Sequence, residues 1–299
     1  MVYTQPSIDY RPCTEREFSA GDRNCGDRWI DIVATIRAYF DDSSDDKRQR
    51  FATVGGLIGH PLSWERFDSL WATATYGLSG PFHATDCDTN PPRGVFKGWT
   101  KERADALMKR LVKVILESRM MGLGTVVPIP EYHQAFPDAQ EHDPYLLALR
   151  HTVINMGQIG RELGENYPDA DGVKMWFEDG DTSGESLRIY QALKAMPEWK
   201  GSTYLRGFSV GNKSLQPLQG ADLLAREAFK HADNMGKLPT RKPVWALKDR
   251  ISFHFWTAEC LQYLKENGGP DNLTALTEWG NKRPPEIPVM TNFYKDSFK

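Results

Sequence analysis

An aspartate lies on the apolar face of a predicted helix, where a charge is unexpected. Within 215–229, Leu218, Ala225 and Phe229 fall at helical spacing on one face, and Asp222 falls on the same face. A charge taken out of water must be neutralised, hydrogen-bonded or bound to a cation. Asp222 is therefore a candidate ligand for a cation in the protein interior.

Two further pairs of acidic residues end apolar runs. Asp41-Asp42 follow Tyr39-Phe40, and Glu178-Asp179 follow Trp176-Phe177. Mg²⁺ and Mn²⁺ prefer such oxygen ligands. Two of these ions, about 3.5–4 Å apart, can activate water and stabilise the leaving oxygen in phosphodiester cleavage. Neighbouring residues of a strand point to opposite faces, so we expect one member of each pair to face the site.

Each acidic segment also has a simpler interpretation. Asp41-Asp42 could form a polar turn, Glu178-Asp179 could lie in a solvated loop, and Asp222 could pair with a buried arginine. The three segments together favour a shared site, because their order along the chain fits one fold.

The composition is that of a soluble globular protein. The chain has 299 residues, of which 40% are hydrophobic and 26% charged, with a net charge of −3. This charge does not favour indiscriminate binding to nucleic acid or to an anionic membrane. We expect no membrane partner, since the apolar stretches are too short to span a bilayer and the N-terminus lacks the pattern of a signal peptide. Four cysteines without a CxxC pair (Cys13, Cys25, Cys87 and Cys260) favour a reduced, cytoplasmic location.

The hydrophobic pattern predicts alternating strands and helices. Strands are expected at 32–40, 51–58, 123–129, 173–177 and 204–210, with a short strand or its exit at 82–86. Helices are expected at 64–76, 101–119, 143–163, 183–195, 215–229 and 250–265, with a shorter one from 272. Helix starts are indicated by Ser63, by Asp143 before Pro144, and by a capping box from Thr182 to Glu185.

This order predicts an α/β fold with a mixed sheet. The strands at 32–40 and 51–58 open the sheet as an antiparallel hairpin, helices flank it, and extra helices follow at the C-terminus. Gly55-Gly56 in the second strand indicates a bulge or a close backbone approach. We expect an N-terminal arm at 1–28, a main domain at 29–236, and a helical extension at 237–299 packed on it.

Five blocks in this order resemble a known family. They are Tyr39-Phe40-Asp41-Asp42-Ser43, Gly55-Gly56-Leu57-Ile58, His83-Ala84-Thr85-Asp86, Phe177-Glu178-Asp179-Gly180 and Leu218-Gln219-Gly220-Ala221-Asp222-Leu223-Leu224-Ala225. Over about residues 33–235 the chain resembles the family called domain of unknown function 3800, a ribonuclease H-like group. The last block, close to Leu-Gln-x-Ala-Asp-Leu, is the most specific.

The chain departs from the family pattern at two blocks. The first block has Asp42 and Ser44 where the family has Glu and Gly. The fourth has Glu178-Asp179 where Asp-Glu is expected. Both changes keep the carboxylates but alter the lengths of their side chains.

The resemblance implies a ribonuclease H-like fold and a Mg²⁺- or Mn²⁺-dependent nuclease. By resemblance, Asp41, Glu178 and Asp222 are the principal ligands, with Asp42 and Asp179 as alternates. His83 and Asp86 are expected to add a general base, a substrate contact or a further ligand. The expected substrate contacts are Ser43, Lys213, Ser214 and Gln219, of which Gln219 could instead orient a ligand.

The expected partner is DNA or RNA. Basic residues that could contact it are Lys47, Arg48, Arg50, Arg93, Lys97, Lys109, Arg110, Lys237, Arg241 and Lys242. Two alternatives stay open from the sequence. The chain could be a catalytically inactive nucleic-acid-binding or interaction module of the same fold, or a hydrolase of a small phosphorylated metabolite.

Overall fold

The computed structural model describes residues 34–45, 47, 49–140, 143–167, 170–180, 182–235 and 239–282. The expected N-terminal arm at 1–28 lies outside the described residues, as do Cys13, Cys25, Arg48 and Lys237.

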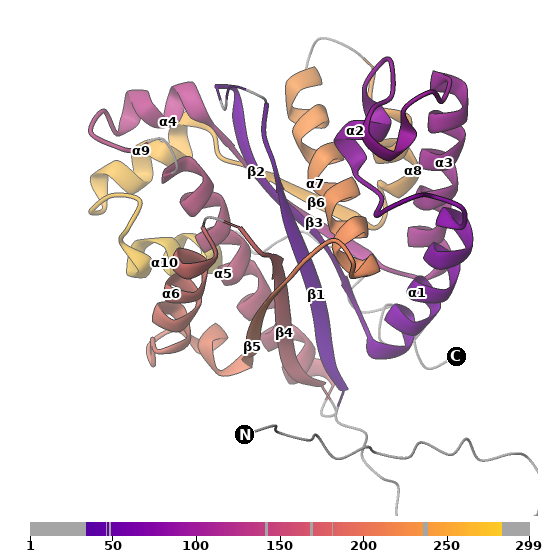
Figure 1. The fold of residues 1–299 in the computed structure, drawn as a ribbon. Helices are drawn as coiled ribbons and strands as arrows, with labels where there is room; N and C mark the ends of the chain where they lie inside the picture. Colours follow the sequence, from indigo (N-terminus) through magenta and orange to yellow (C-terminus); the bar gives the residue numbers. More distant parts are fainter. Residues whose placement is uncertain are drawn as a thin grey trace, which may run out of the picture. The chain divides into compact units, whose positions relative to one another are not determined.

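Six strands form one mixed sheet in the order β5-β4-β1-β2-β3-β6 (Figure 1). Their bounds are β1 Ala34–Ser43, β2 Phe51–Gly59, β3 Met121–Pro128, β4 Ala170–Glu178, β5 Leu205–Gly211 and β6 Ile251–Phe255. Strand β2 is antiparallel to both β1 and β3, whereas β4, β5 and β6 each run parallel to the neighbour they join. The predicted mixed sheet with its opening hairpin is thus confirmed.

Helices cover both faces of the sheet. One face carries α1 Pro61–Thr75, α2 Ala84–Asp88, α3 Lys101–Glu117, α7 Gln216–Asn234 and α8 Lys242–Leu247 (Figure 1). The other carries α4 Ile129–Ala135, α5 Asp143–Asn166, α6 Ser183–Lys194, α9 Ala258–Glu266 and α10 Leu273–Lys282. Short 3-10 turns span Gly94–Phe96 and Lys200–Tyr204. We refer to the two sides as the α7 face and the α5 face.

The alternation of residues along β1 decides which face each side chain joins. Ile36, Ala38 and Phe40 belong to the core on the α5 face, while Tyr39 belongs to the core on the α7 face. Asp41 follows the same alternation and lies on the α7 face. Strand β1 therefore places the Asp41 carboxylate on the face of the sheet that α7 covers.

A glycine lets α7 lie against the sheet beside Asp41. Gly55 pairs with Asp41 across the β1–β2 ladder. A Cβ atom on Gly55 would lie 2.6 Å from the Cα atom and 2.8 Å from the backbone nitrogen of Ala225 in α7. The close backbone approach predicted at this glycine is confirmed. It brings α7 near enough for its side chains to meet those of β1.

We expect Gly55→Ala to lower the free energy of unfolding by about 1–3 kcal/mol, the usual effect of overpacking. The atoms in conflict are backbone, so α7 itself must move. The control is Gly184→Ala in α6, where a Cβ meets nothing within 4 Å. Urea denaturation of both variants measures the difference. Equal stability of Gly55→Ala and the wild type would contradict this packing.

Two helix starts differ from the prediction. Helix α1 begins at Pro61, and the His60 side chain, not Ser63, accepts a hydrogen bond from the Leu62 amide (3.3 Å). Proline suits the first helical position, so the helix begins at Pro61, before the predicted start at residue 64. At α6 the predicted capping bond of Thr182 is absent, since this residue has φ −94° and ψ 1° rather than an extended backbone.

Two predicted elements are wrong. Residues 82–86 form no strand, because the Phe82 and Ala84 amides bond to side chains of α7 and α2 begins at Ala84. The predicted helix 250–265 is strand β6 followed by α9, whose first turn is capped by Thr257. The C-terminal region therefore adds an edge strand beside β3 as well as helices. The short helices α4 and α8 were also not predicted.

The helices of the described part of the chain show no candidate membrane span. None of them is long and apolar enough to cross a bilayer.

Candidate functional site

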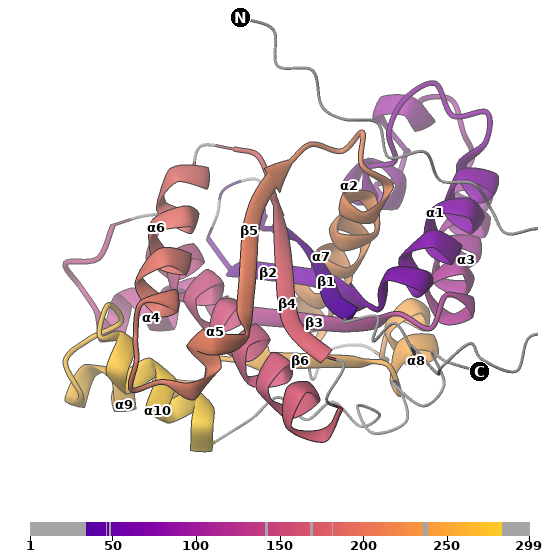
Figure 2. The same ribbon diagram turned by 90° about the horizontal axis from the view of Figure 1, so that it is seen from below.

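Three carboxylates from distant parts of the chain surround one ammonium group. Lys213 Nζ lies 3.2 Å from Asp41 Oδ2, 3.2 Å from Glu178 Oε2 and 3.6 Å from Asp222 Oδ2. The four residues come from β1, β4, α7 and the connection between β5 and α7 (Figure 2). We call them the carboxylate–lysine cluster. The structure brings together the three principal ligands expected from the sequence.

The pairing of β1 with β4 sets two of the carboxylates side by side. The parallel pairing runs to Phe40 and Phe177, so the next residues, Asp41 in β1 and Glu178 at the end of β4, lie at the same level. One step back on the same face, the rings of Tyr39 and Trp176 stack at 4.7 Å with an interplanar angle of 12°. This aromatic pair forms an apolar base beneath the carboxylates.

The cluster is buried on one side and open on the other. The side chains of Asp41 and Asp222 are 1% and 5% exposed, while those of Lys213 and Glu178 are 17% and 29% exposed. Solvent therefore reaches the cluster past Glu178 and Lys213.

Burial and like charge act against ionisation of the two interior acids. Burial and the neighbouring charge of Asp222 raise the pKa of Asp41 well above its usual value, although Lys213 opposes the shift. Burial also raises the pKa of Asp222 against the opposing effect of Lys213. For Lys213, burial disfavours the charged form, but the charges of Asp222, Asp41 and Glu178 outweigh it and raise its pKa. The cluster thus holds more negative charge than one ammonium neutralises.

This electrostatic strain predicts that Asp41→Asn stabilises the metal-free protein at neutral pH. A folded-state pKa above the unfolded value means that ionisation of Asp41 lowers stability as the pH rises through that pKa. Below about pH 4 the carboxyl is protonated in both states, so the advantage of the variant disappears. We expect a gain in Tm of at least about 2 °C at neutral pH.

Thermal melts of both proteins across this pH range, in the presence of a chelator, measure the effect. Asparagine keeps an oxygen for the bond that the Asp42 amide donates to Asp41 Oδ1 (2.8 Å). A difference in Tm that does not change with pH would contradict the electrostatic explanation.

Gln219 holds the backbone that carries Lys213. Its side-chain oxygen accepts hydrogen bonds from Trp71 Nε1 (2.9 Å) and the Phe82 amide (3.2 Å), and its nitrogen donates to the Lys213 carbonyl (2.8 Å). All three partners come from elsewhere in the chain. Gln219, expected as a substrate contact or as an orienting residue, is buried and engaged in positioning.

Asp222 lies one turn after Gln219 and bonds to the same segment, residues 82–84. Its Oδ2 accepts a hydrogen bond from the Ala84 amide (2.7 Å). His83 lies between Phe82 and Ala84, whose amides bond to α7, and a positive charge on it would favour the ionised form of Asp222. Its Nδ1 is buried and has no hydrogen-bond partner among the described residues. His83 therefore borders the cluster, and its role as a base, substrate contact or ligand stays a prediction.

Other residues expected at the site lie apart from it. Asp42 follows Asp41 and so points to the opposite face of the sheet, and it is exposed. Asp179 Oδ1 accepts a hydrogen bond from Ser183 Oγ (3.0 Å) at the start of α6. Asp86 pairs with Arg93 (2.7 Å), and Ser214 bonds to Asn212. Ser43 is buried two residues beyond Asp41 on the same face.

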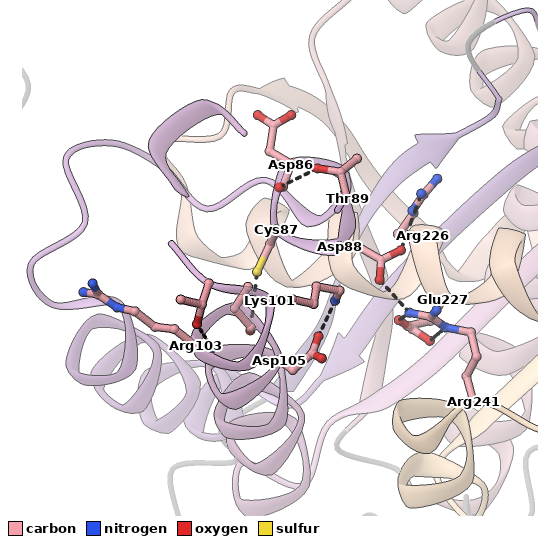
Figure 3. Close-up of polar contacts among 12 residues, drawn as sticks. Asp86, Cys87, Asp88, Thr89, Lys101, Arg103, Asp105, Arg226, Glu227 and Arg241 are labelled. Carbon is pink, nitrogen blue, oxygen red and sulfur yellow. Dashed lines mark hydrogen bonds and ion pairs between the residues drawn. The ribbon is translucent and has the colours of Figure 1, made fainter. Parts of the chain in front are cut away.

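A second charged network was not predicted from the sequence. Arg241 bonds to both oxygens of the fully buried Glu227 (2.7 and 2.8 Å) and to Asp88 (3.1 Å), which Arg226 also approaches at 3.5 Å (Figure 3). These residues tie α8 to α7 and to the end of α2. Each charge has a partner, so the network explains how charged residues are accommodated in the interior.

A groove of about 950 Å³ adjoins this network, at the opposite end of α2 from Asp222. Lys109, Lys230 and Lys242 line it and form no ion pair with an acidic residue of the described chain. Its apolar lining comes from Ala106, Met108, Val112, Pro243 and Ala246. Two further basic residues, Lys101 and Arg241, and three acidic ones, Asp88, Glu102 and Asp105, complete the lining.

Neither comparison with known proteins identifies the chain. No family model matches the sequence, and no curated protein is significantly similar to it. Function is therefore argued from the site. Among the described residues, no group of three or more His, Cys, Asp or Glu side chains is arranged to hold a metal ion as it stands. In the present arrangement the three carboxylates of the cluster face Lys213 instead.

Proposed function

We propose that the protein is a Mg²⁺- or Mn²⁺-dependent nuclease with a ribonuclease H-like fold. The observation that carries this proposal is the convergence of Asp41, Glu178 and Asp222 at one point that opens to solvent. The mixed sheet, with its opening hairpin and the parallel strands β4 and β5, supports the fold that the sequence resemblance implies.

The chemistry of the cluster fits a hard divalent cation. All three candidate ligands are carboxylates, the preferred donors of Mg²⁺ and Mn²⁺. Asp41 Oδ2 is buried, and among the described residues the Lys213 ammonium, at 3.2 Å, is its ion-pair partner. Burial first, and then repulsion from Asp222, raises the pKa of Asp41, and an additional positive charge would relieve that repulsion. These residues would hold the metal, which supplies Lewis-acid stabilisation and a more acidic bound water.

The chain's own groups then have distinct roles. Asp41 and Asp222 are fixed by backbone amides and keep the cluster in place from below. Glu178 lies at the solvent side, where a phosphodiester can approach. Lys213 offers a positive charge to a phosphate oxygen at the same opening, the contact expected from the sequence. His83 borders Asp222 as the candidate proton-transfer group.

The groove supports an anionic polymer as the substrate. Among the basic residues expected to contact nucleic acid, Arg50, Arg93 and Arg241 are held in ion pairs. Lys109 and Lys242 line the groove beside Arg241 and form no ion pair with a described acidic residue. Lysines without acidic partners are available to phosphates, and each phosphate contact releases counterions.

We expect the double variant Lys109→Gln/Lys242→Gln to lower the salt dependence of nucleic-acid binding by about two phosphate contacts. Fluorescence anisotropy over a range of salt concentrations measures this slope. The control replaces two exposed lysines by glutamine: Lys200, in the 3-10 turn that packs on α5, and Lys265 in α9. A slope equal to that of the wild type would place the substrate elsewhere.

The function itself is tested with end-labelled single-stranded DNA, double-stranded DNA and RNA, each incubated with Mn²⁺, Mg²⁺ or a chelator. We expect cleavage of at least one polymer with metal and none with the chelator. Binding of polymers without cleavage in either metal would favour the inactive module. Hydrolysis of nucleotides but not polymers would favour a metabolite hydrolase.

A further inference from the structure

The cation at the centre of the carboxylate–lysine cluster belongs to the protein. The Lys213 ammonium touches one oxygen of each carboxylate, at 3.2, 3.2 and 3.6 Å. These are ion-pair distances, longer than the roughly 2.0–2.1 Å of a magnesium–oxygen bond. Each of the three carboxylates, including the partly exposed Glu178, therefore has Lys213 as a neighbouring cation. Lys213 thus stands at the point where the three candidate ligands meet.

The position of Lys213 is fixed by the fold from both sides. Its carbonyl oxygen accepts the hydrogen bond from Gln219. On the preceding side, the Asn212 side chain accepts a hydrogen bond from the Ser214 amide (2.9 Å), and the Asn212 carbonyl accepts one from the Leu215 amide (3.0 Å). A turn bonded in this way leaves the Lys213 backbone little freedom. The ammonium is therefore part of the built site and not a surface side chain that happens to reach it.

The charges of the cluster limit how many metal ions it can take. A carboxyl group must be ionised to bind a metal ion, and in that form the three carboxylates and one ammonium leave a formal charge of −2. One divalent cation neutralises that charge, whereas a pair would leave a buried excess of positive charge, which is costly. Two-metal sites for phosphodiester cleavage use their second ion as a further positive charge on the reacting phosphate. An ammonium already in place can supply that charge.

We propose that Lys213 holds the place of a second metal ion, so that the cluster binds one divalent cation and not two. This inference rests on the proposed function and specifies the metal content of that same site. Lys213 then presents a fixed positive charge to the non-bridging oxygens of a bound phosphodiester.

The test is the stoichiometry of Mn²⁺ bound to the full chain, without substrate, measured by calorimetry and by electron paramagnetic resonance. We expect one Mn²⁺ with an uncoupled six-line spectrum for the wild type. Lys213→Met should bind two ions whose spectra are coupled, because the variant gains one net negative charge and the space of the ammonium. Lys213→Arg keeps the charge and should again bind one.

The outcomes separate this inference from the proposed function. Two coupled ions in the wild type, or only one in Lys213→Met, would overturn the role of Lys213 and leave the nuclease proposal standing. No Mn²⁺ bound by the folded wild type would overturn both. Lys213→Met is expected to melt below the wild type without metal and to regain that difference with Mn²⁺. If it does not fold, Lys213→Gln carries the same comparison.

Discussion

Asp222→Asn is expected to abolish metal-dependent cleavage, with a loss of more than about 100-fold in rate. Substitution of residues that merely orient metal ligands often costs 10–100-fold, and Asp222 is proposed as a ligand itself. Asparagine retains an oxygen that can accept the hydrogen bond of the Ala84 amide, so the segment 82–84 should stay in place. The loss is measured as kcat/KM on the polymer that the wild type cleaves.

The control for this substitution lies on the same helix. Asp233 of α7 pairs with Arg50 (2.6 Å) at the opposite end from the cluster, so Asp233→Asn should keep full activity. Circular dichroism should show that both variants are folded. Cleavage by Asp222→Asn at the rate of the wild type would remove this residue from the site.

Gln219→Met is expected to lower the free energy of unfolding by about 2–6 kcal/mol. Methionine has similar length but cannot accept the hydrogen bonds of Trp71 Nε1 and the Phe82 amide, which are both buried. Each buried donor left without a partner costs about 1–3 kcal/mol. Loss of the bond to the Lys213 carbonyl should also weaken Mn²⁺ binding by any chains that remain folded.

The same substitution at an exposed position separates this effect from helix propensity. Gln191 lies on the exposed side of α6, so Gln191→Met should change stability by less than about 0.5 kcal/mol. Both variants are compared by urea denaturation. Equal free energies of unfolding for Gln219→Met and Gln191→Met would mean that the hydrogen bonds of Gln219 contribute no net stability.

The acidic residues of the cluster could be predicted because each sits in a strongly patterned element. Asp222 interrupts an apolar stripe that forms α7, and Asp41 follows the alternating strand β1. Periods of 3.6 and 2 residues fix the side on which such residues lie. The choice of Asp41 over Asp42 then follows from β1 having Tyr39 on its α7 face.

The sequence predicts Lys213 as a phosphate contact but not its place among three carboxylates, because it lies in a short connection where no periodicity fixes a side-chain direction. Gln219 could be placed beside Asp222, because it precedes Asp222 by three residues and so shares its face of the helix. Strand β6 had a usable signal. Ile251, Phe253 and Phe255 alternate with Ser252 and His254, but the apolar residues of α9 follow so closely that the pattern also fits a single helix.

The charged network at Asp88 shows a different limit. Glu227 falls beside the apolar stripe of α7, and only the fold brings Arg241 against it (Figure 3). Sequence patterns indicate that a buried charge needs a partner, but not which arginine supplies it.

The central claim is that the carboxylate–lysine cluster binds a divalent cation, and calorimetric titration of Mn²⁺ into the metal-free wild type tests it most directly. We predict saturable binding of Mn²⁺ by the wild type. An excess of chelator should prevent this binding, and Asp222→Asn should abolish it. A folded wild type that takes up no Mn²⁺ would contradict the claim, and Lys213 would then be the structural counterion of three buried or half-buried acids.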